Sequence, residues 1–147
     1  MIAIEDIKKL REETAVSISE CKKALEQTSG NFDKAKEILK QWGKELALKK
    51  TDRETRQGII DSYIHPNKKV GALLELNCES DFVAKSKDFQ NLAHELCLQI
   101  AAIKEETPLL EQAWIKDPSK TIKDLIDEAI GKIGENITVK QYERFEI

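Results

Sequence analysis

The sequence contains few of the residues that build disulfide-rich or metal-binding domains. Its 147 residues include only three cysteines, two histidines and three prolines. An odd number of cysteines without a C-x-x-C pair argues against a disulfide framework and against a zinc site. Each cysteine falls on the apolar face of an expected helix or strand, so we expect buried free thiols, typical of a reducing compartment, at Cys21, Cys78 and Cys97.

An excess of charge of one sign and long apolar runs are also missing. Charged residues make up 35% of the chain, yet the formal net charge is only -3. No uniform field therefore favours nucleic acid or an anionic membrane as a direct partner. No apolar run approaches the length of a membrane span, and the first residues carry acids where a targeting peptide needs bases. We expect a soluble protein that stays in the cytoplasm.

Motifs for catalysis and for phosphate binding are absent from the sequence. His65 precedes Pro66 in an expected turn, and His94 lies beside an apolar helical stripe, so neither histidine has a recognisable nucleophile nearby. The chain contains no G-x-x-x-x-G-K-[ST] loop, so we expect that it does not bind GTP itself. We predict no catalytic residue, no metal site, no cofactor and no covalent chemistry.

The first 45 residues show the spacing of a small helical bundle. Ser17 and Glu20 fit a capping box at a helix start, Gly30 ends that helix, and Asn31 can cap the next one. The apolar stripes of the three helices fall at Ile4, Ile7 and Leu10, at Cys21, Ala24 and Leu25, and at Ala35, Ile38, Leu39 and Trp42. We predict a three-helix domain over residues 1–45.

A basic stretch follows this predicted bundle. Its cations are Lys44, Lys49, Lys50, Arg53 and Arg56. No aromatic residues alternate with them to stack on bases, and nearby acids dilute the charge. We therefore interpret residues 46–56 as a solvated linker rather than a nucleic-acid site.

Residues 57–147 change to a pattern of strands and helices. Apolar residues alternate on both sides of a turn at 65–68, and the second strand places Val70, Ala72, Leu74, Leu76 and Cys78 on one face. Helical stripes follow over 89–101 and 121–134, separated by an irregular stretch near residues 114–118, and a last strand is expected over 137–145. The sequence predicts an α+β domain in which two helices cover a three-stranded antiparallel sheet.

The turn after the second strand reads Ser80-Asp81-Phe82-Val83. From the residues alone, its simplest interpretation is structural: Ser80 caps a short helix, Asp81 complements the helix dipole, and Phe82 belongs to the core. The alternative interpretation is a functional turn that presents an acid and an aromatic ring.

Three ordered motifs resemble the elongation factor Ts family. The run Glu75–Val83 matches its signature E-[LV]-N-C-x-T-D-F-V except at Ser80. Upstream, Leu10–Thr14, Cys21–Leu25 and Lys34-Ala35 match, and Ile133–Ile137 matches near the end. At residues 14–19 the family usually shows T-G-A-G-M-M, where this chain has T-A-V-S-I-S. Short members carry a helical insertion at the position of residues 102–109, where this chain has almost nothing.

The resemblance implies a guanine-nucleotide exchange factor that binds elongation factor Tu and promotes GDP release. It implies a ubiquitin-associated (UBA)-like N-terminal bundle and an α+β core that forms a homodimer. Two groups of residues would contact the partner: Ser80, Asp81, Phe82 and Val83, which disturb its magnesium and phosphate site, and Lys8, Arg11, Ile18 and Ser19 of the bundle. The alternative is a UBA-like adaptor that binds proteins without exchange activity.

Overall fold

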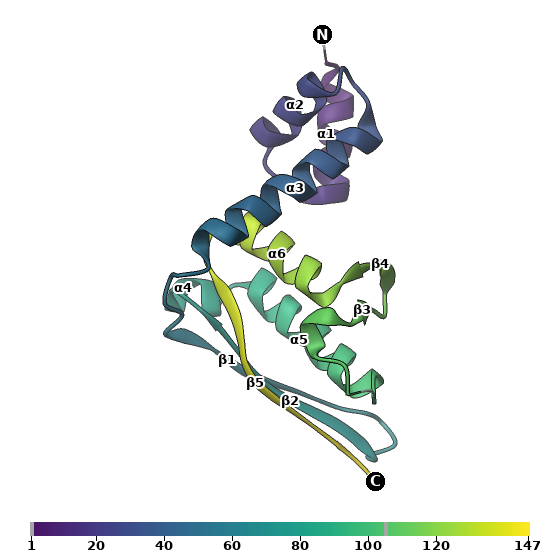
Figure 1. The fold of residues 1–147 in the computed structure, drawn as a ribbon, viewed down its shortest axis with the longest axis vertical. Coiled ribbons are helices and arrows are strands. Elements are labelled where there is room, and N and C mark those ends of the chain that lie inside the picture. Colours follow the sequence, from purple (N-terminus) through teal and green to yellow (C-terminus); the bar gives the residue numbers. More distant parts are fainter. Residues whose placement is uncertain (1, 105) are drawn as a thin grey trace.

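The chain folds into a helical N-terminal part and a larger mixed part, connected by one long helix (Figure 1). The computed structural model describes residues 2–104 and 106–147; Met1 and Glu105, which the predicted domain ranges include, lie outside the described residues. The N-terminal part comprises α1 (Ile4–Thr14), α2 (Ile18–Gln27) and most of α3 (Phe32–Lys50). The larger part comprises β1 (Gln57–Ile64), β2 (Val70–Cys78), α4 (Asp81–Ala84), α5 (Lys87–Ala102), η1 (Leu109–Glu111), β3 (Ala113–Trp114), β4 (Asp117–Thr121), α6 (Ile122–Ile133) and β5 (Ile137–Glu146).

Helices α1 to α3 begin where the sequence places capping residues. The Ser17 hydroxyl accepts the Glu20 N–H at 3.3 Å, and the Asn31 side chain accepts the Lys34 N–H at 3.0 Å. Each bond satisfies one of the amides that a helix start leaves without a partner. The buried side chains between the helices are Ile7, Leu10, Cys21, Ala24, Leu25, Ala35 and Leu39. The predicted helical N-terminal region is therefore confirmed.

Helix α3 is longer than the sequence pattern predicts. It runs to Lys50, and Ala47 packs into the core of the larger part with 6% of its surface exposed. Residues 46–50 contain good helix formers and no breaker, so the helix continues as long as one face can be buried. The first five residues of the stretch 46–56 are thus helical, and Ala47 is buried rather than solvated. The division into domains 1–45 and 57–147 remains a prediction.

The larger part contains an antiparallel sheet in the order β1-β2-β5. Strands β1 and β2 form a hairpin in which Ile64 lies opposite Gly71, and the His65 N–H donates to the Val70 carbonyl at 2.9 Å across the turn. Strand β5 pairs with the other edge of β2, with a register shift between Glu75 and Leu76. This arrangement confirms the predicted α+β class with its three-stranded antiparallel sheet.

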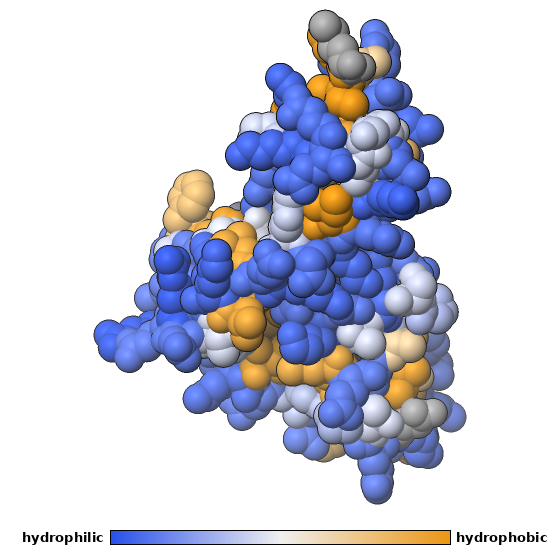
Figure 2. Space-filling model, turned by 45° about the horizontal axis from the view of Figure 1, so that its top comes forward, coloured by the Kyte–Doolittle hydropathy of each residue, from blue (hydrophilic) through white to orange (hydrophobic). Residues whose placement is uncertain are grey.

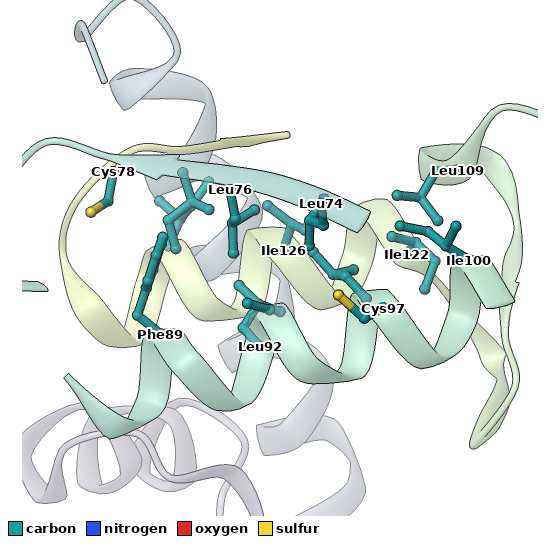
Figure 3. Packing of buried hydrophobic residues seen from close by; sticks show 14 of the residues in the cluster. Leu74, Leu76, Cys78, Phe89, Leu92, Cys97, Ile100, Leu109, Ile122 and Ile126 are labelled. Atoms are coloured by element: carbon teal, nitrogen blue, oxygen red, sulfur yellow. The ribbon is translucent and has the colours of Figure 1, made fainter. Parts of the chain in front are cut away.

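Helices α5 and α6 lie on the same side of this sheet (Figure 1). Figure 3 shows Leu74, Leu76 and Cys78 on the side of β2 that faces α5, which contributes Phe89, Leu92 and Cys97. Phe89, Leu76 and Cys78 have no exposed surface, so the alternating apolar residues of β2 form the floor of the main core. The face predicted to be buried is the buried one.

All three cysteines are buried free thiols, as predicted. Burial disfavours the charged thiolate, which raises the pKa of Cys78 to about 11 and the pKa of Cys97 to about 12. Negative charge from Glu135 adds to the effect at Cys78, and negative charge from Asp61 adds to it at Cys97. These thiols are therefore poor nucleophiles in the folded protein.

The N-terminal part rests on the larger part where α3 crosses α6. A Cβ atom added at Gly131 would lie 3.1 Å from the Cα of Gly43, so the two backbones approach closely at these glycines. Lys40 and Lys44 of α3 pair with Asp124 of α6 at 3.6 Å and 3.3 Å. The crossing combines close packing with ion pairs and places the bundle at one end of the sheet (Figure 1).

The stretch near residues 114–118, expected to be irregular, contains a second small sheet. Strand β3 pairs with β4, and the buried side chain of Gln99 bonds to the carbonyl of Ala113 at 3.0 Å and to the N–H of Ile115 at 2.9 Å. A two-residue strand is too short for an alternating pattern to reveal it. Its position depends on a buried side chain of α5, which neighbouring residues in the sequence do not indicate.

Candidate functional site

The turn Ser80–Val83 is separated from β2 by Glu79 alone, and it contains the start of the four-residue helix α4. Ser80 has an extended backbone, and its hydroxyl accepts the Val83 N–H at 3.2 Å, which is the capping bond expected from the sequence. Phe82 is 86% exposed. The structural interpretation is therefore right for Ser80 and wrong for Phe82, which is not a core residue. Because Val83 and Ala84 face the core, the ring of Phe82 lies on the other side of the single helical turn.

The other two residues of the predicted contact set lie in different environments. Val83 is 8% exposed and belongs to the core, so its side chain anchors the turn. Asp81 is exposed and pairs with Lys85 at 2.8 Å, and this hydrogen bond raises the pKa of Lys85. Asp81 also lies in the first turn of α4, where a negative charge suits the helix dipole. The surface of the turn thus offers one aromatic ring beside a carboxylate.

A carboxylate from a distant part of the sequence holds this turn. Glu135, between α6 and β5, accepts the Glu79 N–H at 3.1 Å and the Ser80 N–H at 2.9 Å on one oxygen. Its other oxygen accepts the Ser80 hydroxyl at 2.6 Å. In the sequence this residue stands out only as part of a family motif, and no local pattern indicates a bond that spans 55 positions.

Further bonds tie the same loop to the end of α3. The Asn136 N–H donates to the Glu79 carboxylate at 2.6 Å, and the Asn136 side chain donates to the Arg53 carbonyl at 2.8 Å. Arg53 in turn pairs with Glu79 at 3.5 Å. Three segments that are far apart in the sequence therefore meet behind the turn: the end of β2, the loop before β5 and the residues after α3.

The second predicted group lies on the N-terminal bundle. Lys8 and Arg11 are three residues apart on α1, so they share one face, and Ile18 and Ser19 begin α2. All four are exposed, with Ile18 at 53%. The visible surface of the bundle is mostly hydrophilic, with smaller apolar patches (Figure 2). The structure does not bring this group into contact with the Ser80–Val83 turn.

The corner between α1 and α2 shows why a glycine suits the position of Ala15. Ala15 caps α1 in the left-handed region with φ of 58°, and its N–H donates to the Arg11 carbonyl at 2.7 Å. The Cβ of an alanine is crowded in this conformation, whereas glycine adopts it freely. The corner keeps its shape with alanine, at the cost of local strain.

Among residues 2–104 and 106–147, no group of three or more histidine, cysteine or acidic side chains is placed to hold a metal ion. Within the same described ranges, no helix is both long and apolar enough to cross a membrane.

The site is thus an exposed aromatic ring on a turn that several hydrogen bonds hold to an α+β scaffold. Comparison with known proteins gives the family. The family model described as "Elongation factor TS" matches residues 3–104 and 79–147. A protein named "Elongation factor Ts" from Herpetosiphon aurantiacus is 39% identical over 193 aligned residues, covering 99% of this chain and 98% of that protein. The chain belongs to the elongation factor Ts family, a family of translation elongation factors.

Two further relatives with the same name show similar coverage. The protein from Thermodesulfovibrio yellowstonii is 40% identical over 192 residues, covering 99% of this chain and 96% of the relative. The protein from Caldanaerobacter subterraneus is 35% identical over 193 residues, with 99% and 96% covered. These aligned lengths exceed the 147 residues of this chain, so the relatives contain residues that this chain lacks.

Proposed function

We propose that the protein is a guanine-nucleotide exchange factor that binds elongation factor Tu carrying GDP and promotes release of the nucleotide. The observation that carries the proposal is the 86% exposed ring of Phe82. It stands at the position that matches the phenylalanine of the family signature, and the turn beneath it is capped by Ser80 and anchored by Val83. A ring fixed in this way can enter a partner without a rearrangement of its own backbone.

The mechanism is competition between two ligands for incompatible conformations of one GTPase. If the exchange factor favours a conformation in which the magnesium and phosphate contacts are disturbed, factor and nucleotide weaken each other's binding by the same factor. Burial of one phenylalanine side chain contributes about 1.5 to 3 kcal/mol. This energy corresponds to about a 10- to 100-fold change in affinity. The exchange needs no covalent step, and Asp81 acts beside the ring.

One aromatic ring is too little to release a tightly bound nucleotide, so the proposal includes a second contact area on the UBA-like bundle. Lys8, Arg11, Ile18 and Ser19 are exposed on α1 and at the start of α2. Ile18 offers apolar surface where the family usually has methionine. Because α3 and α6 pack closely, the bundle and the core can bind as parts of one surface.

The proposal also includes a homodimer formed through the outer face of the sheet. The register places Ile64, Gly71 and Phe145 in one row across the three strands, on the face opposite the buried residues of β2. Phe145 is 71% exposed and Ile60, on the same face, is 64% exposed. Among the described residues, α5 and α6 cover only the other face (Figure 1).

A second copy is the occupant that this face fits best. The outer face carries exposed apolar side chains at Ile60, Ile64, Leu73 and Phe145, with polar residues such as Glu75 and Glu143 between them. Two copies of this face can pack across a two-fold axis as a sandwich about 10 Å thick. Covering the face in this way also removes an exposed apolar patch that favours aggregation. We place the protein in the cytoplasm, where translation takes place, and expect no direct contact with nucleic acid.

The test is release of a fluorescent GDP analogue from elongation factor Tu in the presence of excess unlabelled GDP. We expect this protein to accelerate release when it is present at a small fraction of the GTPase concentration. Acceleration at substoichiometric amounts distinguishes exchange from simple sequestration. A UBA-like adaptor without exchange activity leaves the release rate at its intrinsic value, and this result overturns the proposal.

A further inference from the structure

The carboxylate of Glu135 makes three hydrogen bonds to one short segment, and this concentration sets it apart from the surface acids. It accepts two consecutive backbone amides, at 3.1 Å from Glu79 and 2.9 Å from Ser80, and the Ser80 hydroxyl at 2.6 Å. A carboxylate that accepts several amides forms charge-assisted bonds, which are stronger than bonds between neutral groups. The side chain lies in the part-buried space between α6, β5 and the end of β2.

These bonds take the place of the inter-strand hydrogen bonds that end at Cys78. Cys78 is the last residue of β2 paired with β5, so the next two amides need partners outside the sheet. Glu135 supplies both partners from the loop that precedes β5. It therefore fixes the direction in which the chain leaves the strand.

The Ser80 hydroxyl carries the constraint one step further. It donates to Glu135 at 2.6 Å and accepts the Val83 N–H at 3.2 Å, so a single rotamer serves both bonds. The second of these bonds caps α4, which has only four residues and cannot form as an isolated helix. The orientation of Phe82 on that turn thus depends on a chain of bonds that begins at Glu135.

We propose that Glu135 is a positioning residue for the exchange reaction, an inference that rests on the proposed function. Its carboxylate holds the Ser80–Val83 turn in the conformation that presents Phe82. A preformed turn avoids the cost of ordering backbone and side chain on binding, which is a general source of affinity in protein interfaces. Glu135 itself does not need to touch the GTPase.

The proposal predicts a graded series of variants. Glu135→Ala removes all three acceptor bonds, and we expect GDP release to slow about 10-fold, less than or equal to the loss caused by Phe82→Ala. Glu135→Gln keeps one carbonyl oxygen for the two amides but loses the charge, so we expect an intermediate rate. Glu128→Ala is the matched control because Glu128 is an acid of α6 that pairs with Lys120 at 3.1 Å, away from the turn. We expect it to exchange at the unaltered rate.

A double variant separates positioning from a general structural role. If Glu135 acts through Phe82, the combination of Glu135→Ala with Phe82→Ala exchanges no more slowly than Phe82→Ala alone. Multiplied losses in the double variant, or an unchanged rate in Glu135→Ala, overturn the inference. If the unaltered protein does not accelerate release, the proposed function itself fails, and this outcome is distinct from either of the others.

Amide hydrogen exchange provides a readout that does not require the GTPase. In Glu135→Gln, we expect the amides of Ser80 and Val83 to exchange at least several-fold faster, while amides in the middle of α5 keep their protection. Unchanged protection at Ser80 and Val83 in a folded variant overturns the proposal that Glu135 holds this turn. Should Glu135→Ala fail to fold, Glu135→Gln and its own double variant with Phe82→Ala carry the same test.

Discussion

Truncation of Phe82 is the most direct test of the proposal that its ring enters the GTPase as a wedge. With 86% of its surface exposed, the ring has almost no packing to lose in the free protein. Phe82→Ala should therefore change the free energy of unfolding by less than about 0.5 kcal/mol, the usual range for surface substitutions. The capping bond of Ser80 and the buried side chain of Val83 remain in place. The variant isolates the ring from the fold.

The expected loss in exchange follows from the area that the ring buries in the partner. A phenylalanine that moves from water into an apolar site contributes about 1.5 to 3 kcal/mol, so its removal should slow catalysed GDP release about 10- to 100-fold. The rate is measured by stopped-flow fluorescence at several concentrations of the factor. Phe82→Leu keeps most of the apolar area and should recover part of the rate.

Phe145→Ala is a matched control, since Phe145 is also an exposed phenylalanine, at 71%, but lies on the outer face of the sheet. At protein concentrations above the dissociation constant of the dimer, this variant should promote GDP release at the unaltered rate. An unchanged rate for Phe82→Ala, with circular dichroism and thermal unfolding also unchanged, would refute the reasoning about the wedge. Equal losses in both phenylalanine variants would show that exposed apolar area in general, not this turn, determines the rate.

Three further predictions concern assembly, thiol chemistry and local strain. Phe145→Glu should convert a dimer into a monomer in sedimentation experiments at micromolar concentration, because it places a charge in the apolar row, whereas a monomer before the substitution contradicts the dimer. Thiol reagents at pH 8 should label no cysteine until the protein is denatured, and rapid labelling of the folded protein argues against burial. The free energy of unfolding should fall as the pH rises from 9 toward 11–12. The reason is that the folded-state pKa values of Cys78 and Cys97 lie above the ordinary value of 9.0, so the folded protein holds these protons more tightly than the unfolded chain. Ala15→Gly should raise the free energy of unfolding by about 1 kcal/mol in denaturant titrations because it relieves a left-handed conformation, and a loss of stability shows that the corner is not strained.

The sequence was sufficient for the elements whose signals are local. Capping residues such as Ser17, Asn31 and Thr121 stand within three positions of the amides they satisfy, so their pattern indicates helix starts directly. The alternation along β2 indicates its buried face for the same reason, because side-chain direction in a strand has a period of two. The family motifs were sufficient to predict membership of the elongation factor Ts family, which the comparisons confirm.

Other features were decided by contacts between distant residues. Helix α3 continues to Lys50 because Ala47 finds a place in the core of the larger part, and the strands β3 and β4 are held by the buried Gln99. Neither effect has a signature in neighbouring residues. The contact residues themselves stay a prediction, which the exchange rate of Phe82→Ala tests.

The sequence by itself determined the order and type of the main helices and of the three-stranded sheet, and it marked Ser80-Asp81-Phe82-Val83 as a turn of interest. It left open whether Phe82 is buried or exposed, since both interpretations fit the same four residues. Only the tertiary structure decided this point. Once Val83 and Ala84 fill the core and Glu135 fixes the exit from β2, the geometry of a single helical turn directs the ring of Phe82 to the surface.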